Sequence, residues 1–132
     1  MEIKNNKEIK FIVEGNLPSW GKIANNWRAL TGYKKRWIWI VDTALFIASF
    51  FPIKFKFNKA VISIYREYGF KKKPFDDSNL QSVIDKLVID RLAILGFFQT
   101  KSDRKVTYQK PIQKYNPKIQ FDKIEIQIKE EG

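Results

Sequence analysis

Hydrophobic side chains recur at helical spacing in two segments of the chain. The first segment predicts a helix from about Tyr33 to Ser49 that is buried on most sides and closed by Pro52. The second predicts a helix from about Ser78 to Leu95 that stops at Gly96. Its apolar stripe consists of Leu80, Val83, Ile84, Leu87, Val88 and Leu95.

Segments with strand character lie before, between and after these helices. Ile9–Glu14 is apolar and β-prone, Phe55–Tyr65 predicts one strand or two short ones, and Val106–Ile112 alternates weakly. Phe121–Lys129 alternates cleanly, with isoleucines on one face and polar residues on the other, which is typical of a strand buried on one face. This order predicts a single α+β domain over residues 1–132, with a mixed sheet packed by two helices.

The charge of the chain favours a polyanionic partner. Lysine and arginine number 25 against 14 acidic residues among 132, so the formal net charge is +11. A surplus of this size on a small domain favours nucleic acid first and an anionic membrane surface second. Met1–Lys10 is polar, and the most apolar stretch, Trp37–Phe51, is interrupted by Asp42 and shorter than the roughly 20 residues of a membrane span. We therefore expect a cytoplasmic protein that does not enter a membrane.

The chain contains no cysteine and no histidine. This excludes disulfides, thiol catalysis, zinc sites built from Cys and His, and any catalytic triad with a histidine base. Enzymatic chemistry would have to come from carboxylates, lysines, hydroxyl groups and a hard cation such as Mg²⁺.

Aspartates gather in the middle of the chain, inside a basic surround. The aspartates are Asp76, Asp77, Asp85, Asp90 and Asp103, and the bordering cations are Lys71, Lys72, Lys73, Lys101, Arg104 and Lys105. Cations of this kind hold a phosphate backbone, while carboxylates hold a divalent metal that activates water for phosphodiester cleavage. The alternative for Asp76-Asp77-Ser78 is a helix N-cap, which is the commoner use of such residues.

Further residues have two interpretations each. Lys34, Lys35 and Arg36 begin the first predicted helix, where positive charge opposes the helix dipole, so they indicate either phosphate contact or a solvated face. Trp20 and Trp27 are candidates for stacking on unpaired bases or for burial in a core or interface. Phe75 is a candidate wedge at a branch point or a seal over the core.

The central segment resembles a known family. Asp76-Asp77-Ser78-Asn79-Leu80 is followed by Lys86, Asp90, Leu92 and Gly96, and then by Ser102-Asp103-Arg104-Lys105-Val106. This order resembles the signature of the RusA-type Holliday junction resolvases, in which Asp-x-Asp-Asn-Leu opens a helix that carries a Lys and Asp-x-Leu. In that family the helix ends at a Gly, and Asp-Asp-x-x-Val follows. The upstream half, with Pro18-Ser19 after a strand and then an aromatic, basic helix, is also similar.

The resemblance implies a fold, a reaction and a set of residues. It implies a RusA-like homodimer that binds four-way DNA junctions and makes paired symmetric nicks with Mg²⁺, with Mn²⁺ as a substitute. Asp76 matches the first metal ligand, Asp103 the last, and Lys86 the helix lysine that assists at the scissile phosphate. Asp77 or Asp85 would supply a third carboxylate. Lys71, Lys72, Lys73, Lys101 and Arg104 would hold the DNA backbone.

The chain departs from the family pattern in three places. Ser78 and Ser102 stand where the family has acids. Lys86 and Asp90 lie four residues further from Asn79 than in the family pattern, and Ser82 is the alternative occupant of the lysine position. Two further functions therefore stay open. The first is a catalytically degenerate module of the same fold that binds branched DNA, and the second is a basic adaptor for an acidic protein.

Overall fold

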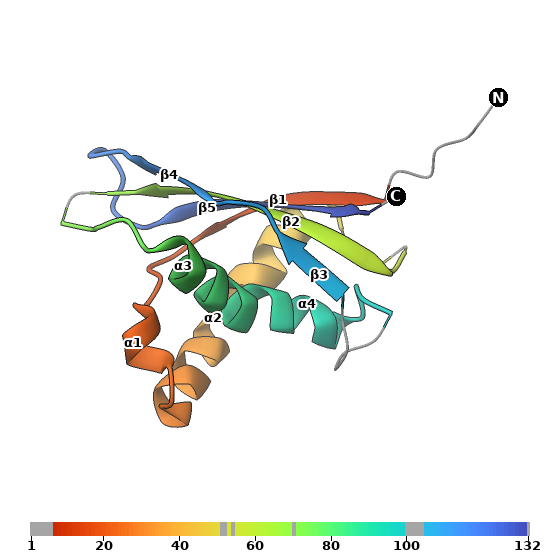
Figure 1. Ribbon diagram of the computed structural model, residues 1–132, viewed down its shortest axis with the longest axis horizontal. Helices are drawn as coiled ribbons and strands as arrows, with labels where there is room; N and C mark the ends of the chain where they lie inside the picture. Colours follow the sequence, from red (N-terminus) through yellow and green to blue (C-terminus); the bar gives the residue numbers. More distant parts are fainter. Residues whose placement is uncertain (1–6, 51–52, 54, 70, 100–104, 132) are drawn as a thin grey trace.

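The alternating segments of the sequence form one mixed sheet, and the helices cover one of its faces (Figure 1). The protein is represented by a computed structural model that describes residues 7–50, 53, 55–69, 71–99 and 105–131. The strands are β1 (Glu8–Glu14), β2 (Lys59–Tyr68), β3 (Lys105–Tyr108), β4 (Ile112–Tyr115) and β5 (Lys123–Glu130). The helices are α1 (Trp20–Ile23), α2 (Trp27–Ile47), α3 (Asp77–Ile84), the π-helical turn η1 (Asp85–Ile89) and α4 (Asp90–Leu95).

The sheet has the strand order β1-β5-β2-β3, and β4 pairs with β2 beyond β3. β5 runs antiparallel to both β1 and β2, whereas β3 and β4 run parallel to β2. The long β2 strand therefore pairs with β3 along its first half and with β4 along its second half. The prediction of an α+β domain with a mixed sheet packed by helices is confirmed.

Inward side chains of the three central strands build the core. Phe11 lies opposite Ile126, and Ile126 lies opposite Ile64, so one apolar row crosses β1, β5 and β2. All three side chains are buried. Fully burying a side chain of this size contributes roughly 1.5–3 kcal/mol, so rows of this kind hold the sheet to the helices. The clean alternation predicted for Phe121–Lys129 is confirmed, with β5 bounded at Lys123 and Glu130.

Helix α2 begins six residues earlier than the sequence pattern predicts. The side chain of Asn26 accepts a hydrogen bond from the amide of Ala29 at 3.2 Å and caps the helix there. Gly32, which the prediction treated as part of the preceding segment, lies inside the helix. The expectation that this helix is buried on most sides is wrong, because only Trp37, Val41, Ala44 and Leu45 on one face are buried.

The second predicted helix is present but is not uniform. It runs through α3, widens into the π-helical turn η1 and continues as α4, ending at Gly96 with φ 96°. Leu87, Val88 and Ile89 are all buried, and a wider turn is what lets three consecutive side chains face the core. Arg91 of α4 donates to both carboxylate oxygens of Asp42 in α2, at 2.9 and 2.7 Å, and this hydrogen bonding raises the pKa of Arg91.

Two strands occupy the region predicted as one. The weakly alternating segment Val106–Ile112 contains β3, which ends at Tyr108, and only the first residue of β4. Pro111 separates them and has no amide hydrogen to give to the ladder. β2 extends to Tyr68, three residues past the predicted end, and Phe57 instead forms an isolated bridge with Phe98.

Candidate nucleic-acid interface

A buried arginine organises the region around the central acidic residues. Arg66 stands on the inward face of β2 with 1% of its surface exposed, and its guanidinium Nη2 donates to Oδ1 of Asp122 at 2.8 Å. Asp122 is fully buried, and its other carboxylate oxygen accepts from the amide of Leu17 at 3.0 Å. Burying an ion pair this deeply is expensive unless further hydrogen bonds satisfy its polar atoms.

The second guanidinium nitrogen of Arg66 holds the loop that leads to α3. Nη1 donates to the carbonyl oxygen of Lys73 at 3.0 Å and to Oε1 of Gln113 at 2.8 Å. The guanidinium carbon lies 4.6 Å from the ring centroid of Phe75 and 5.0 Å from that of Tyr68, within the range of cation–π attraction. Arg66 therefore ties β2 to the backbone directly before Asp76.

Gln113 completes this attachment. Its Oε1 accepts from the amide of Phe75 at 2.9 Å, and its Nε2 donates to the carbonyl oxygen of Phe75 at 2.8 Å. The Gln113 side-chain amide thus makes the two hydrogen bonds to the Phe75 backbone that a neighbouring β-strand would otherwise make. Phe75 is half-buried and packs against the core, which favours a seal over a wedge at a DNA branch point. We call Arg66, Asp122, Gln113 and Phe75 the arginine clamp.

The lysine loop, Lys71–Lys73, lies immediately before the clamp. Lys71 and Lys73 are exposed and Lys72 is half-exposed. Lys71 adopts the left-handed backbone conformation, with φ 67°, which a residue with a side chain holds only where its surroundings require it. Gly69 sets the start of the loop, since an added Cβ would lie 2.2 Å from the carbonyl oxygen of Ile119. The backbone is therefore constrained at two positions, by close packing at Gly69 before the loop and by the left-handed conformation of Lys71 within it.

Asp76 and Asp77 open α3 and are both exposed. Asp76 is the N-cap residue, but its carboxylate makes no capping hydrogen bond to the helix. Asp77 is the first helical residue, where a negative charge interacts favourably with the helix dipole. The simple capping interpretation therefore accounts for the position of Asp76 but not for its carboxylate oxygens.

A cavity of about 400 Å³ opens beside the α3–η1 junction. Its lining consists of Trp20, Ser78, Gln81, Ser82, Asp85, Lys86 and Tyr108. The Tyr108 hydroxyl donates to Oδ1 of Asp85 at 2.6 Å and joins β3 to η1. Ser82 and Lys86, the two alternatives for the family lysine position, both line this cavity, and Trp20 lies here at the edge of the core. We call this cavity the η1 cavity.

The helix separates the candidate metal ligands into two groups. Asp77 and Asp85 are eight residues apart, or about 12 Å along the helix axis, so a single ion cannot bind both carboxylates. This spacing favours Asp77 over Asp85 as a companion of Asp76. Within the described part of the chain, no three acidic side chains cluster closely enough to hold a metal ion. Asp103, together with Lys101, Ser102 and Arg104, lies outside the described residues.

The other predicted phosphate contacts differ in their surroundings. Lys34 forms an ion pair with Asp90 at 3.1 Å, so it joins α2 to α4. Lys35 and Arg36 are exposed, and Arg36 lies 5.0 Å from the ring centroid of Tyr33. Lys105 is exposed at the start of β3. The arrangement leaves Lys35, Arg36 and Lys105 accessible to a polyanion, whereas Lys34 already has a carboxylate partner.

Of the clamp residues, only Phe75 was predicted from the sequence; Arg66, Gln113 and Asp122 were not, and neither was Tyr108. A signal existed for Arg66, since it continues the inward alternation of Ala60, Ile62 and Ile64 along β2. A charged residue at such a position indicates a buried partner.

No family model matches the chain, and a search of curated proteins finds no match either. None of the described helices has the length and apolar character needed to cross a membrane.

Proposed function

We propose that this protein is a Mg²⁺-dependent, structure-selective endodeoxyribonuclease that resolves four-way DNA junctions by paired symmetric nicks. The observation that carries the proposal is the arginine clamp. It uses a buried arginine and a side-chain amide to fix the short segment that separates the lysine loop from Asp76. A merely solvated run of charges needs no such support, whereas a site that must hold phosphate beside a metal does.

The residues present suit a hard cation and a DNA backbone. Asp76 and Asp77 present neighbouring exposed carboxylates, the donor type that Mg²⁺ prefers, and Asp103 would complete the ligand set. When bound, the cation would activate water and stabilise the leaving oxygen of the cleaved phosphodiester, and Mn²⁺ would serve as a substitute. Lys86 would offset charge on the scissile phosphate from the η1 cavity, while the lysine loop and Lys105 would hold the backbone.

A catalytically degenerate module that binds branched DNA is the second candidate. Two observations favour it. Ser78 stands at a position where the RusA-type signature has an acid. The described residues also contain no group of three ligating side chains. In this case the aspartates would only cap the start of α3 and form ion pairs.

Cleavage of a synthetic four-way junction tests the proposal. The full-length protein is incubated with the junction and with a linear duplex of matched sequence, in Mg²⁺, in Mn²⁺ and in EDTA. We expect paired nicks in the junction alone that require the metal. Junction binding without nicks in either metal would establish the degenerate module. Equal affinity for junction and duplex would reject both and leave the adaptor for an acidic protein.

Replacing Lys71, Lys72 and Lys73 together by glutamine should weaken junction binding and reduce its dependence on salt. Each lysine that contacts a phosphate contributes about 0.9 to the slope of log affinity against log salt concentration. We therefore expect the slope to become shallower by roughly 2–3, measured by fluorescence anisotropy between about 50 and 200 mM salt. The matched control replaces Lys114, Lys118 and Lys129, which are exposed but lie outside the lysine loop. Equal losses in both triple variants would show that only net charge matters.

A further inference from the structure

The helix that runs from α3 into η1 carries a polar stripe beside its buried apolar one. Ser78, Gln81, Ser82 and Asp85 follow the spacing that places residues on one face of a helix. All four line the η1 cavity, and Gln81, Ser82 and Asp85 are half-buried. An ordinary polar helix face is turned to bulk solvent. This stripe instead borders a hollow of the protein.

Two aromatic side chains from other elements complete the cavity. Trp20 comes from α1, which packs against α3 (Figure 1), and Tyr108 comes from β3. Trp20 also packs against the hydrophobic core, and the hydroxyl of Tyr108 is held by its hydrogen bond to Asp85. Both rings are therefore fixed before any ligand arrives, which lowers the entropy lost on binding.

The cavity offers hydrogen-bonding groups that the rest of the described chain does not use. Among the described residues, the Gln81 side-chain amide and the Ser78 hydroxyl have no hydrogen-bond partner. Ser82 donates its hydroxyl to the Ser78 carbonyl at 2.9 Å, which leaves the lone pairs of its own oxygen as acceptors. A side-chain amide both donates and accepts. The set therefore suits a ligand that carries donors and acceptors side by side.

The helix leaves regular α geometry where it reaches the cavity. Asp85 and Lys86 are the first two residues of η1, and both line the cavity. π-helical turns inside α-helices are rare, and they occur frequently at functional sites. The position of η1 therefore supports a binding role for the cavity, independently of its polar lining.

The charges at the cavity favour a neutral ligand. Asp85 supplies one carboxylate and Lys86 supplies one ammonium group. A hard cation needs several oxygen ligands and would meet the Lys86 charge, whereas a phosphate would meet the Asp85 charge. A nucleobase carries no net charge, presents donors and acceptors along its edge, and has a flat face that stacks on aromatic side chains. A cavity of about 400 Å³ is of the size that binds small ligands.

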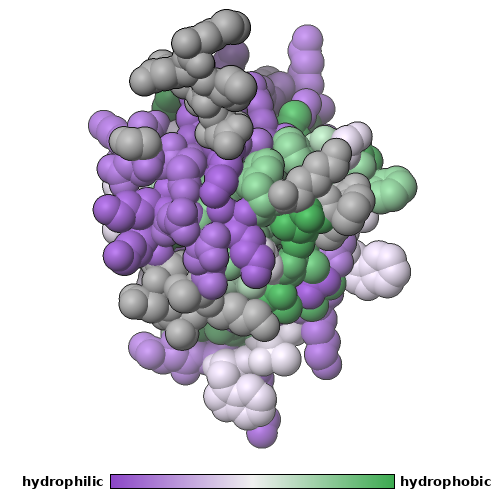
Figure 2. Space-filling view, turned by 90° about the vertical axis from the view of Figure 1, so that its right-hand side faces the viewer, coloured by the Kyte–Doolittle hydropathy of each residue, from purple (hydrophilic) through white to green (hydrophobic). Residues whose placement is uncertain are grey.

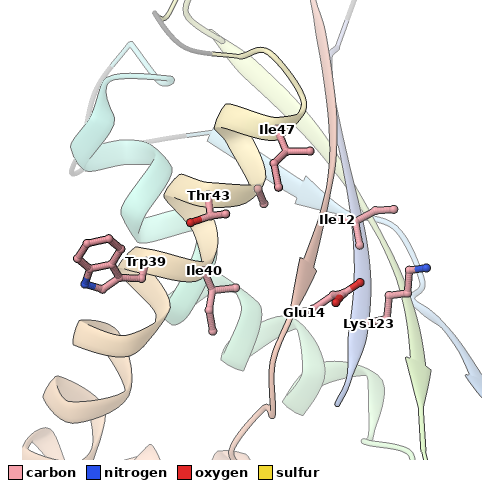
Figure 3. A pocket seen from close by; sticks show the side chains of 8 residues that line it. Ile12, Glu14, Trp39, Ile40, Thr43, Ile47 and Lys123 are labelled. Carbon is pink, nitrogen blue, oxygen red and sulfur yellow. The ribbon is translucent and has the colours of Figure 1, made fainter. Parts of the chain in front are cut away.

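The molecule has a larger hollow, a groove of about 510 Å³ between α2 and β1, but its chemistry is different. Figure 3 shows Trp39 and Ile47 of α2 across from Ile12 of β1. Among the described residues, those that line this groove include no side-chain amide. Figure 2 shows that hydrophobic side chains also gather on one flank of the surface, beside a large hydrophilic area. Apolar surface of this kind gives a polar ligand few partners, so the η1 cavity is the better site for a base.

We propose that the η1 cavity takes up one unstacked nucleobase of the junction, with Trp20 stacking on its face and Gln81 bonding to its edge. The inference rests on the proposed function, because the base belongs to the nucleotide whose phosphate lies beside Asp77. Gln81 is four residues beyond Asp77, or about 6 Å along the helix axis, so a single nucleotide can reach from the candidate metal ligands into the cavity.

Uptake of a base gives the protein a means of distinguishing a junction from a linear duplex. A base inside a duplex must be unpaired and unstacked before it can enter a pocket. The free-energy cost is smallest for bases that are already poorly paired or stacked, as at a branch point. The cavity therefore adds structure selectivity to the phosphate contacts of the lysine loop, which are the same on any DNA.

Junctions that lack a single base test this site. An abasic nucleotide replaces each nucleotide around the branch point in turn, and affinity is measured by fluorescence anisotropy with Ca²⁺ in place of Mg²⁺. We expect one abasic position to weaken binding of the wild type by about 5–100-fold, the effect of losing one base stacked on an aromatic side chain. Equal affinity for the intact junction and for every abasic junction overturns the proposal.

Variants of the cavity test whether the base is bound there. Trp20→Leu keeps an apolar contact with the core but removes the aromatic face, and Gln81→Leu removes the amide. The abasic loss should shrink in both, and in Trp20→Leu to below about 2-fold, because the contact is already missing. Trp27→Leu is the matched control, since that ring is 71% exposed and lies outside the cavity lining, and it should keep the full abasic loss.

Two outcomes would contradict the assignment of the base to this cavity. One is an abasic loss of wild-type size in both cavity variants, and the other is an abasic loss that disappears in Trp27→Leu. Circular dichroism of each variant confirms that it is folded. Gln81→Leu keeps the test decisive if Trp20→Leu does not fold, because Gln81 lies outside the hydrophobic core.

Binding and nicking are scored separately in the same proteins. Base-dependent binding without nicks in Mg²⁺ would uphold the base site in a degenerate module and reject cleavage. Metal-dependent nicks with no base dependence would reject the base site and leave the nuclease proposal standing. A protein that binds no junction would overturn both.

Discussion

Replacing Arg66 by methionine should lower the free energy of unfolding by about 3–5 kcal/mol, the cost of removing one partner from a buried ion pair. Methionine occupies similar space but leaves the fully buried Asp122 carboxylate without its cationic partner. It also removes the donor to the Lys73 carbonyl and to Gln113. This loss is a large fraction of the stability of a domain of this size.

Urea denaturation followed by tryptophan fluorescence measures this effect. The control is Lys34→Met, which breaks the more exposed pair with Asp90 and should cost less than about 1 kcal/mol. Adding Asp122→Leu to Arg66→Met should recover part of the lost stability, because no unpaired charge then remains buried. A cost for Arg66→Met as small as that of the exposed pair would show that solvent reaches the Arg66–Asp122 pair, and the clamp would not be a structural anchor.

The clamp also makes a prediction about the loop beside it. In Gln113→Leu, the amide and carbonyl of Phe75 both lose their side-chain partner. Trypsin should then cut inside the lysine loop, after Lys71 or Lys72, faster than in the wild type, under conditions where the sheet remains folded. This follows because local opening becomes easier when backbone hydrogen bonds are lost. Unchanged cleavage would mean that Arg66 alone fixes the loop.

The elements with a strong local signal were predictable. β5 shows strict alternation, and the helix from α3 to α4 shows an apolar stripe between Asp76-Asp77-Ser78 and Gly96. The π-helical turn has one signal in the sequence, the run of three consecutive apolar residues Leu87-Val88-Ile89. In a regular amphipathic helix, the apolar residues are instead three or four positions apart. The early start of α2 was missed because Gly32 lowers helix propensity, while tertiary packing and the Asn26 cap outweigh it.

The candidate site was predictable only in part. The lysine loop and Asp76 lie close together in the sequence, so their order along the chain is enough to predict that they are neighbours in the structure. In the clamp, Gln113 on β4 and Asp122 directly before β5 are separated from Arg66 on β2 by 47 and 56 residues. No pattern within a short stretch of sequence can predict a contact between residues so far apart along the chain. The same holds for Tyr108 and Asp85, which only the pairing of β3 with β2 brings together.

Asp76→Asn should reduce the rate of junction cleavage by roughly 10²–10³-fold, since a metal ligand contributes several kcal/mol to the transition state. The reduction should leave junction binding intact or tighter, because one negative charge near phosphate is removed. Asp103→Asn should behave in the same way. Single-turnover nicking and anisotropy titration in Ca²⁺ measure the two quantities separately. Asp42→Asn, which lies on α2 and contacts Arg91, is the control that should cut at the wild-type rate.

Comparison of Asp77→Asn with Asp85→Asn then identifies the third carboxylate. The two residues are about 12 Å apart along the helix, so only one of them can share an ion with Asp76. If Asp77 is the ligand, Asp77→Asn should show a raised Mg²⁺ requirement, whereas Asp85→Asn should keep the wild-type metal dependence. The opposite result would place the ion in the η1 cavity beside Lys86, and Asp76→Asn would then cut at the wild-type rate. Asp103→Asn cutting as fast as the wild type would contradict both assignments.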